Sequence, residues 1–162
     1  MPCLIADSGP LIALAKLGLL DLPVRLFGRA AMPETVFAEC LAQGWLADAQ
    51  AIRGAVDAGH LEVMADLAWP ADGEAPRLDA GELAVLSMAA QLGATVLIDE
   101  RRGRQAARHL GLNVVGVCGL LLRANRLGWI GPLAPLLEQL QQEGYFISPA
   151  LVVAVLARAG ER

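Results

Sequence analysis

Residues 79–117 read DAGELAVLSMAAQLGATVLIDERRGRQAARHLGLNVVGV, and this stretch decides the fold class. Short apolar segments alternate in it with longer segments of helical character. The expected elements are, in order, a helix over 79–92 that ends at Gly93, a strand over 95–98, a helix over 102–110, a strand over 114–117 and a helix over 120–127. Such alternation is typical of a parallel sheet that helices cover on both faces.

The segments before this stretch continue the alternation. An apolar strand over 3–6 stops at a DSGP sequence, in which Asp7 or Ser8 can cap a helix and Pro10 suits its first turn. The other expected elements are helices over 11–17 and up to about residue 27, a strand over 30–32, helices over 33–42 and 46–58, and a strand over 61–64. Residues 66–76 hold two prolines and a glycine without a sustained period, which predicts a mobile loop.

Two more helices are expected at the end of the chain, over 132–143 and 149–159. The apolar side of the last one could close the core or meet a second subunit. With 162 residues the chain has the length of one ordinary domain. We therefore expect a three-layer α/β/α domain with a central parallel sheet over 1–130, and a helical extension over 131–162 that packs on the same domain.

Composition and charge narrow the class of protein. Hydrophobic residues make up 56% of the chain, but no charge-free stretch reads as a membrane span, and residues 1–7 do not resemble a signal peptide. These features predict a cytoplasmic protein. The net charge of −4 argues against a broad nucleic-acid footprint, so any such contact must be local. Cys3, Cys40 and Cys118 are widely spaced among apolar residues, which favours buried free thiols.

Four acidic side chains are expected near one edge of the sheet. Asp7 follows the first strand and Asp99 follows the strand over 95–98, so both lie at the carboxyl edge where open parallel sheets bind ligands. Glu82 begins the helix after the loop, with helical spacing that turns it toward the protein body, and Glu39 lies on an earlier helix. Carboxylates so close would partly neutralise unless a cation held them, and oxygen ligands suit Mg²⁺ or Mn²⁺. Such ions can activate a water for attack on a phosphodiester, which makes RNA hydrolysis the leading hypothesis.

Four segments together resemble the PIN-domain family. They are LIADSGPLI at 4–12, the helix over 33–39, LDAGE at 78–82 and LIDERRGR at 97–104. More closely, they are similar to an uncharacterised prokaryotic branch described as nucleic-acid-binding proteins containing a PIN domain. The resemblance covers about residues 4–127. It implies a metal-dependent endoribonuclease, often the toxin of a toxin and antitoxin pair.

The resemblance also implies roles for single residues. Asp7, Glu39, Glu82 and Asp99 would form the catalytic acidic site, with Asp7, Glu82 and Asp99 as the principal ligands of Mg²⁺ or Mn²⁺. Glu39 would support them. Ser8 would bind a phosphate or a water on the metal, and the activated water would be the nucleophile.

Some positions depart from the family pattern. Glu82 stands where many PIN nucleases have Asp, and Leu97 replaces the Thr or Ser that is usual two places before the later Asp. Glu100 is an extra acid. A longer side chain at position 82 shifts the metal position and could weaken activity.

Each acid also has a purely structural explanation. Asp7 could cap a helix, Asp79 and Glu82 have the spacing of a capping box, and Glu39 could be a solvated charge. Asp99 with the following residue could form an ordinary turn into a helix. The joint placement of the acids is what favours a shared site.

The remaining candidate residues are basic or aromatic. Arg101, Arg102 and Arg104 directly follow Asp99, so they either contact RNA phosphates at the rim of the site or pair with surface acids such as Glu100. The histidines and tryptophans are scattered, and we expect them to be packing or surface residues rather than bases or a stacking platform: His60, His109, Trp45, Trp69 and Trp129.

Three functions remain open. The first is a ribonuclease that uses Mg²⁺ or Mn²⁺. The second is a module with an altered PIN site that binds RNA or a protein without cutting. The third is an interaction subunit that works through its terminal helices. The expected partners are RNA, a small antitoxin protein and a second copy of the chain, with no membrane.

Overall fold

A single parallel sheet lies at the centre of the molecule. The computed structural model describes residues 3–43, 46–70 and 73–161. Within these residues the strands are β1 (Leu4–Ala6), β2 (Ala30–Pro33), β3 (Glu62–Met64), β4 (Thr95–Leu97) and β5 (Val114–Val115). They pair in the order β3-β2-β1-β4-β5, and every pair is parallel. The expected α/β architecture with a central parallel sheet is confirmed.

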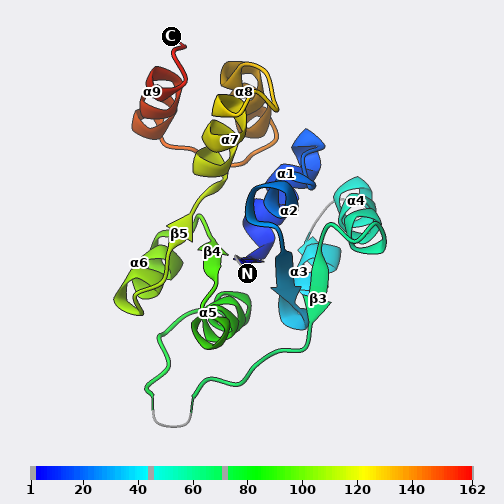
Figure 1. Ribbon diagram of the computed structural model, residues 1–162, viewed down its shortest axis with the longest axis vertical. Coiled ribbons are helices and arrows are strands. Elements are labelled where there is room, and N and C mark those ends of the chain that lie inside the picture. Colours follow the sequence, from blue (N-terminus) through cyan, green and yellow to red (C-terminus); the bar gives the residue numbers. More distant parts are fainter. Residues whose placement is uncertain (1–2, 44–45, 71–72, 162) are drawn as a thin grey trace.

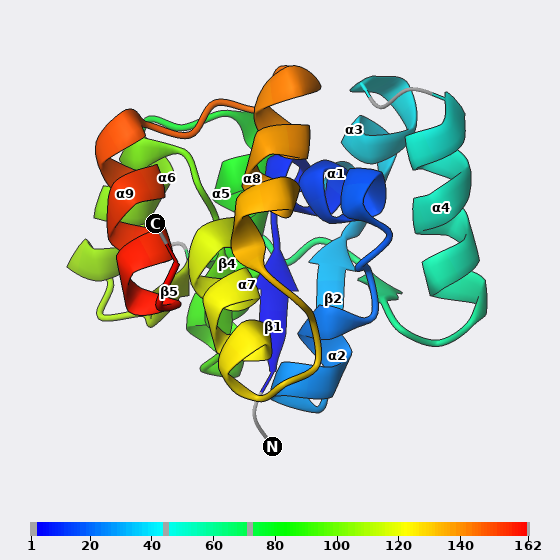
Figure 2. The same ribbon diagram turned by 90° about the horizontal axis from the view of Figure 1, so that it is seen from above.

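Helices cover both faces of this sheet (Figure 1). Those described are α1 (Ser8–Leu17), α2 (Leu22–Phe27), α3 (Glu34–Gln43), α4 (Leu46–Asp57), α5 (Ala80–Leu92), α6 (Arg101–His109), α7 (Val117–Arg126), α8 (Leu133–Gln142) and α9 (Pro149–Arg158). Helix α5 packs below β1, β2 and β4, whereas α1, α2 and α7 lie above the sheet in Figure 1. Figure 2 looks onto the upper face, with α7 and α8 in front of the sheet. Buried aliphatic side chains fill both layers, and Leu4 and Ile5 of the central strand are completely buried.

The position of β1 in the sheet determines where a ligand site is expected. Strand β2 lies on one side of β1 and β4 on the other, so the chain leaves β1 and β4 in connections that run in opposite directions across the sheet. The backbone N–H of Asp7 donates to the Leu97 carbonyl at 3.0 Å, which ties the two strand ends together. Ligands of open α/β sheets bind at such a switch point.

Helix α7 begins earlier than its sequence predicts. We expected it from Leu120, after a strand that reaches Val117, but the strand stops at Val115 and the helix begins at Val117. Gly116 takes the extended N-cap conformation, and the Asp99 carboxylate accepts the Val117 N–H. A distant acid therefore supplies the cap that the local sequence lacks.

The C-terminal helices pack on the rest of the domain. Helix α8 contacts α1 and α7, and α9 contacts α7 and α8. The Glu161 carboxylate accepts the N–H groups of Leu133 and Ala134 at 2.7 and 3.0 Å, which caps α8 from the far end of the chain. Phe146 and Val153 remain exposed, so the association of two copies through this region stays a prediction.

The remaining structural predictions have clear outcomes. Cys3, Cys40 and Cys118 are free thiols; Cys40 and Cys118 are buried as expected, whereas Cys3 is only partly buried. In the described part of the chain, none of the helices combines the length and apolarity that a membrane crossing requires. The loop before α5 has neither helix nor strand where it is described. Two hydrogen bonds hold its first residues: the Thr35 N–H donates to the Asp66 carboxylate at 3.2 Å, and the Gln91 amide donates to the Ala68 carbonyl at 3.0 Å.

Candidate active site

Asp7 is a buried carboxylate at the end of β1. It occupies the N-cap position of α1 with an extended backbone, but its side chain makes no capping hydrogen bond. Only 8% of the residue is exposed. Burial raises the pKa of Asp7 to about 6, repulsion from the carboxylates of Asp79, Glu39 and Glu100 raises it too, and the Ser8 backbone N–H lowers it. The Asp7 side chain therefore faces other acids and does not cap α1.

Glu39 reaches the same place from α3. Its carboxylate accepts the Ser8 hydroxyl at 3.1 Å, and burial raises its pKa while this hydrogen bond lowers it. The first turn of α5 approaches so closely that a Cβ on Gly81 would lie 2.4 and 2.5 Å from the two Glu39 oxygens. With a larger residue at position 81, the Glu39 carboxylate would have to move away from α5.

Glu82 enters the cluster from the first turn of α5. The residue is 8% exposed, so the prediction that it faces the protein body is confirmed. Its backbone N–H donates to the Asp79 carboxylate at 2.8 Å, so Asp79 caps α5 as the capping-box spacing predicts. Burial raises the pKa of Glu82 to about 8, with further increases from a hydrogen bond and repulsion from Asp79 and from repulsion by Glu100 and Asp7.

Two members of the cluster were not among the predicted site residues. Asp79 raises the pKa of Asp7, Glu39 and Glu82, and Glu100 raises that of Asp7 and Glu82. Glu100 also caps α6 by accepting the Gly103 N–H at 2.9 Å. The sequence holds a signal for Glu100: consecutive residues of an extended chain point to opposite sides, so Asp99 and Glu100 do not face the same cluster.

Asp99 lies at the expected edge, but its side chain faces α7. It accepts the Val117 N–H at 3.3 Å and the Tyr145 hydroxyl, and a Cβ on Gly116 would lie 2.4 Å from its Oδ1. Burial raises the pKa of Asp99, whereas Tyr145, the Val117 N–H and Arg104 lower it. Among the described acids, the structure thus brings Asp7, Glu39 and Glu82 together with Asp79 and Glu100. Asp99 adjoins this group through Tyr145, whose pKa is raised by burial and by both the Asp99 and the Asp7 carboxylates.

The chemistry of this cluster suits a hard divalent cation. As the side chains stand in the described residues, no three Asp, Glu, His or Cys groups are arranged to hold a metal ion. The donors are nevertheless all carboxylates, which Mg²⁺ and Mn²⁺ prefer. The raised pKa values of Asp7 and Glu82 measure how unfavourable it is to keep these carboxylates ionised without a cation. Asp7 and Glu82 are therefore the carboxylates whose ionised forms a cation would stabilise most, and Asp79, Glu100 and Glu39 lie near them.

The predicted arginines separate into different environments. Arg102 lines a hollow of about 590 Å³ together with Asp79, Glu82 and Glu100, so it stands beside the acids. Arg104 instead donates to the Ile98 carbonyl at 2.9 Å and lies near Asp99. Arg101 is exposed on α6. Of the three, Arg102 has the position that contact with a phosphate at the rim requires.

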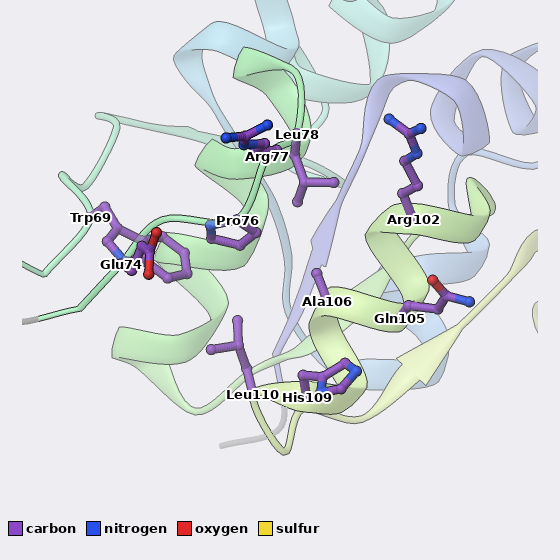
Figure 3. A pocket seen from close by; sticks show the side chains of 10 residues that line it. All are labelled: Trp69, Glu74, Pro76, Arg77, Leu78, Arg102, Gln105, Ala106, His109 and Leu110. Carbon is purple, nitrogen blue, oxygen red and sulfur yellow. The ribbon is translucent and has the colours of Figure 1, made fainter.

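The scattered aromatic residues have separate environments. Trp129 stacks under the Arg25 guanidinium, 4.2 Å from the ring centre. Trp69 packs against the core and, together with His109, lines a hollow between the loop before α5 and α6 (Figure 3). His60 lines a different hollow, between α1 and α4. Trp45 lies outside the described residues.

Comparison with known proteins places this fold in a family. A family model described as a PIN domain matches residues 3–161, so the chain belongs to the PIN-domain family. Its fold is similar to that of a PilT N-terminus domain protein from the hyperthermophilic archaeon Sulfolobus solfataricus P2, with a TM-score of 0.59 and 17% identity over 75% of this chain and 92% of that one. None of the curated proteins matches the sequence significantly. PIN domains are generally nucleases that use divalent metal ions, which agrees with the chemistry of the carboxylate cluster.

Proposed function

We propose that this protein is an endoribonuclease that depends on Mg²⁺ or Mn²⁺. The observation that carries the proposal is the group of mutually repelling carboxylates around the buried Asp7 and Glu82, at the end of β1 and the start of α5, in a chain of the PIN-domain family. Asp7 and Glu82 would hold the ion, with support from Glu39, Asp79 and Glu100. A bound dication would lower the pKa of a water and stabilise charge on the phosphodiester.

The protein's own side chains would position the substrate. The Ser8 hydroxyl, held by Glu39 at 3.1 Å, is placed beside Asp7 and can orient a water or a phosphate oxygen. Arg102 at the rim would neutralise part of the phosphate charge. Asp99 contributes by position, because it ties the start of α7 and Tyr145 to the end of β4.

A catalytically inactive RNA- or protein-binding module is the second candidate. The observation that favours it is the present arrangement of the described side chains, in which no three potential ligands are placed to hold a metal. Glu82 also favours an inactive site, because its side chain is longer than the Asp of many PIN nucleases and changes the distance from the backbone to the ion.

The cellular role is a further part of the proposal. A toxin in the cytoplasm would need a small antitoxin protein, and a short gene beside this one would support that role. The exposed Phe146 and Val153 near the C-terminal helices offer apolar surface to such a partner or to a second copy of the chain.

A cleavage assay with matched variants separates these candidates. Purified protein with Mn²⁺ is incubated with end-labelled single-stranded RNAs, beside Asp7→Asn, Glu82→Gln and, as control, Asp57→Asn on the exposed side of α4. Loss of a ligand should reduce cleavage by more than the roughly 10–100-fold typical of a residue outside the metal's own ligands. The control should cleave like the wild type, and chelation should stop both. If the wild type cleaves no faster than Asp7→Asn, the enzyme is excluded, and unchanged RNA binding would then support the module.

A further inference from the structure

A hollow of about 670 Å³ lies beside the carboxylate cluster, between the loop before α5 and the outer side of α6 (Figure 3). Arg77, Leu78 and Arg102 line both this hollow and the smaller one that contains the acids. The two hollows therefore share a wall and lie next to each other. A polymeric ligand with one unit bound at the acids would therefore place its next unit in the larger hollow.

The walls of this hollow combine apolar surface with polar ends. Pro76, Leu78, Ala106 and Leu110 contribute the apolar part, and Figure 3 shows their side chains between the loop and α6. Arg77 and Arg102 stand at the end that it shares with the acids. The volume is within the roughly 300–1,000 Å³ usual for small-ligand sites. Glu74, Gln105 and His109 complete the lining. A flat ring with polar edge groups and an anionic group at the arginine end matches this distribution.

The indole N–H of Trp69 is a hydrogen-bond donor beside this hollow. This buried N–H can only donate a hydrogen bond, and it has no acceptor among the described residues. Buried donors in proteins are nearly always paired, so this one invites an acceptor from a ligand. Gly73 lies close against it, since a Cβ there would be only 3.2 Å from Nε1, so a ligand acceptor would reach this N–H with a small shift of the turn at Gly73. Nucleobases carry carbonyl and ring-nitrogen acceptors that an aliphatic ligand lacks.

We propose that this hollow binds one unpaired nucleotide of the RNA, the neighbour of the phosphate held at the acids. The base would lie between Trp69, Pro76 and Ala106, and its phosphate would meet Arg77 and Arg102. The proposal rests on the ribonuclease function proposed above and names its substrate as single-stranded RNA, because a paired base cannot enter. It also explains local contact with nucleic acid by a chain whose net charge is −4.

Hydrogen bonds hold both walls in place before any ligand arrives. Gln91 fixes the Ala68 carbonyl at 3.0 Å, and Gly73 N–H donates to the Pro70 carbonyl at 3.1 Å. On the other side Glu100 caps α6 through Gly103. These hydrogen bonds fix parts of both walls, which favours a nucleotide site over a surface that folds around its partner.

Binding in EDTA tests the hollow without requiring cleavage. The affinity of a fluorescent single-stranded RNA and of its duplex is measured for the wild type, Ala106→Phe, which fills the hollow, and Arg102→Gln. Arg108→Gln, at an exposed position of α6 outside the hollow, is the matched control. Ala106→Phe should weaken single-strand binding by about 5- to 150-fold, the loss of one stacked base. Arg102→Gln should also lower the slope of log K against log salt by about 1. The control should change neither quantity.

The outcomes separate this proposal from the nuclease itself. If Ala106→Phe binds single-stranded RNA like the wild type, or if duplex binding falls equally, the nucleotide site is refuted while cleavage can still stand. Binding that depends on the hollow in a protein that never cleaves would refute the nuclease and leave the site in place. In an active protein, Ala106→Phe should raise KM and leave kcat nearly unchanged.

A second variant guards against a folding defect. Trp69→Phe keeps an aromatic ring but removes the donor, and it should weaken binding by about 2- to 12-fold, the contribution of one hydrogen bond. Trp129→Phe, at the tryptophan stacked on Arg25, is its control. Unchanged binding by Trp69→Phe, when Ala106→Phe does not fold, overturns the proposal.

Discussion

Replacing Asp7 by Asn should stabilise the metal-free protein at alkaline pH. The pKa of Asp7 rises on folding from 3.8 to about 6, so between these values the folded state binds more protons than the unfolded state. The free energy of unfolding therefore falls as the pH rises through this window. A shift of this size corresponds to about 3 kcal/mol, because each pKa unit is worth about 1.4 kcal/mol. An uncharged Asn avoids the whole loss.

Thermal unfolding in EDTA measures this difference. For a domain of this size, about 3 kcal/mol corresponds to a rise in Tm of roughly 6–12 °C at about pH 8. At about pH 4 the wild type and Asp7→Asn should unfold together, since the wild-type carboxyl is then protonated in the folded state. Asp57→Asn makes the same change of charge at an exposed position of α4 and should show no such pH dependence.

Adding Mn²⁺ completes the experiment. The ion should raise the Tm of the wild type at about pH 8 and leave that of Asp7→Asn nearly unchanged, because binding to the folded state alone stabilises it. The reasoning is refuted if Asp7→Asn is no more stable than the wild type at this pH, or if the difference between them does not depend on pH.

Three further substitutions test the contacts around the site. Gly81→Ala would bring a Cβ against the Glu39 carboxylate and force that flexible side chain to move, so in chemical denaturation it should lose most of the stabilisation of up to about 1 kcal/mol that Gly54→Ala, with open space around it, should give α4. Tyr145→Phe removes a donor to the half-buried Asp99 carboxylate; the loss of about 1–3 kcal/mol should grow with pH, as Tm measurements from acid to alkaline pH would reveal. Lys16→Met leaves its buried aspartate partner, 2.8 Å away, without a countercharge and should cost about 3–5 kcal/mol, most of which a second, apolar substitution of that aspartate should restore in urea unfolding.

Local sequence patterns were enough to predict the elements and most of the cluster. The apolar runs and the glycines that end helices determine the order of strands and helices, and helical spacing alone turns Glu82 inward. The side-chain direction at the end of β4 needed more than the local sequence. Asp99 faces α7 because the Val117 N–H and the Tyr145 hydroxyl both donate to its carboxylate. Tyr145 lies in the connection between α8 and α9, whose position relative to Asp99 cannot be predicted from sequence periodicity.

Helix ends explain why so many acids can stand together at all, and why they still call for a cation. Asp7 and Glu100 occupy the N-caps of α1 and α6, and Asp79 and Glu82 stand at the start of α5, so three helices direct their positive ends at the cluster. Each helix end stabilises a nearby negative charge by about 0.3–1 kcal/mol. Asp7 alone loses about 3 kcal/mol to burial and repulsion, converted at about 1.4 kcal/mol per pKa unit. The helix ends therefore offset only part of the repulsion, and the remainder is free energy that a bound dication would recover.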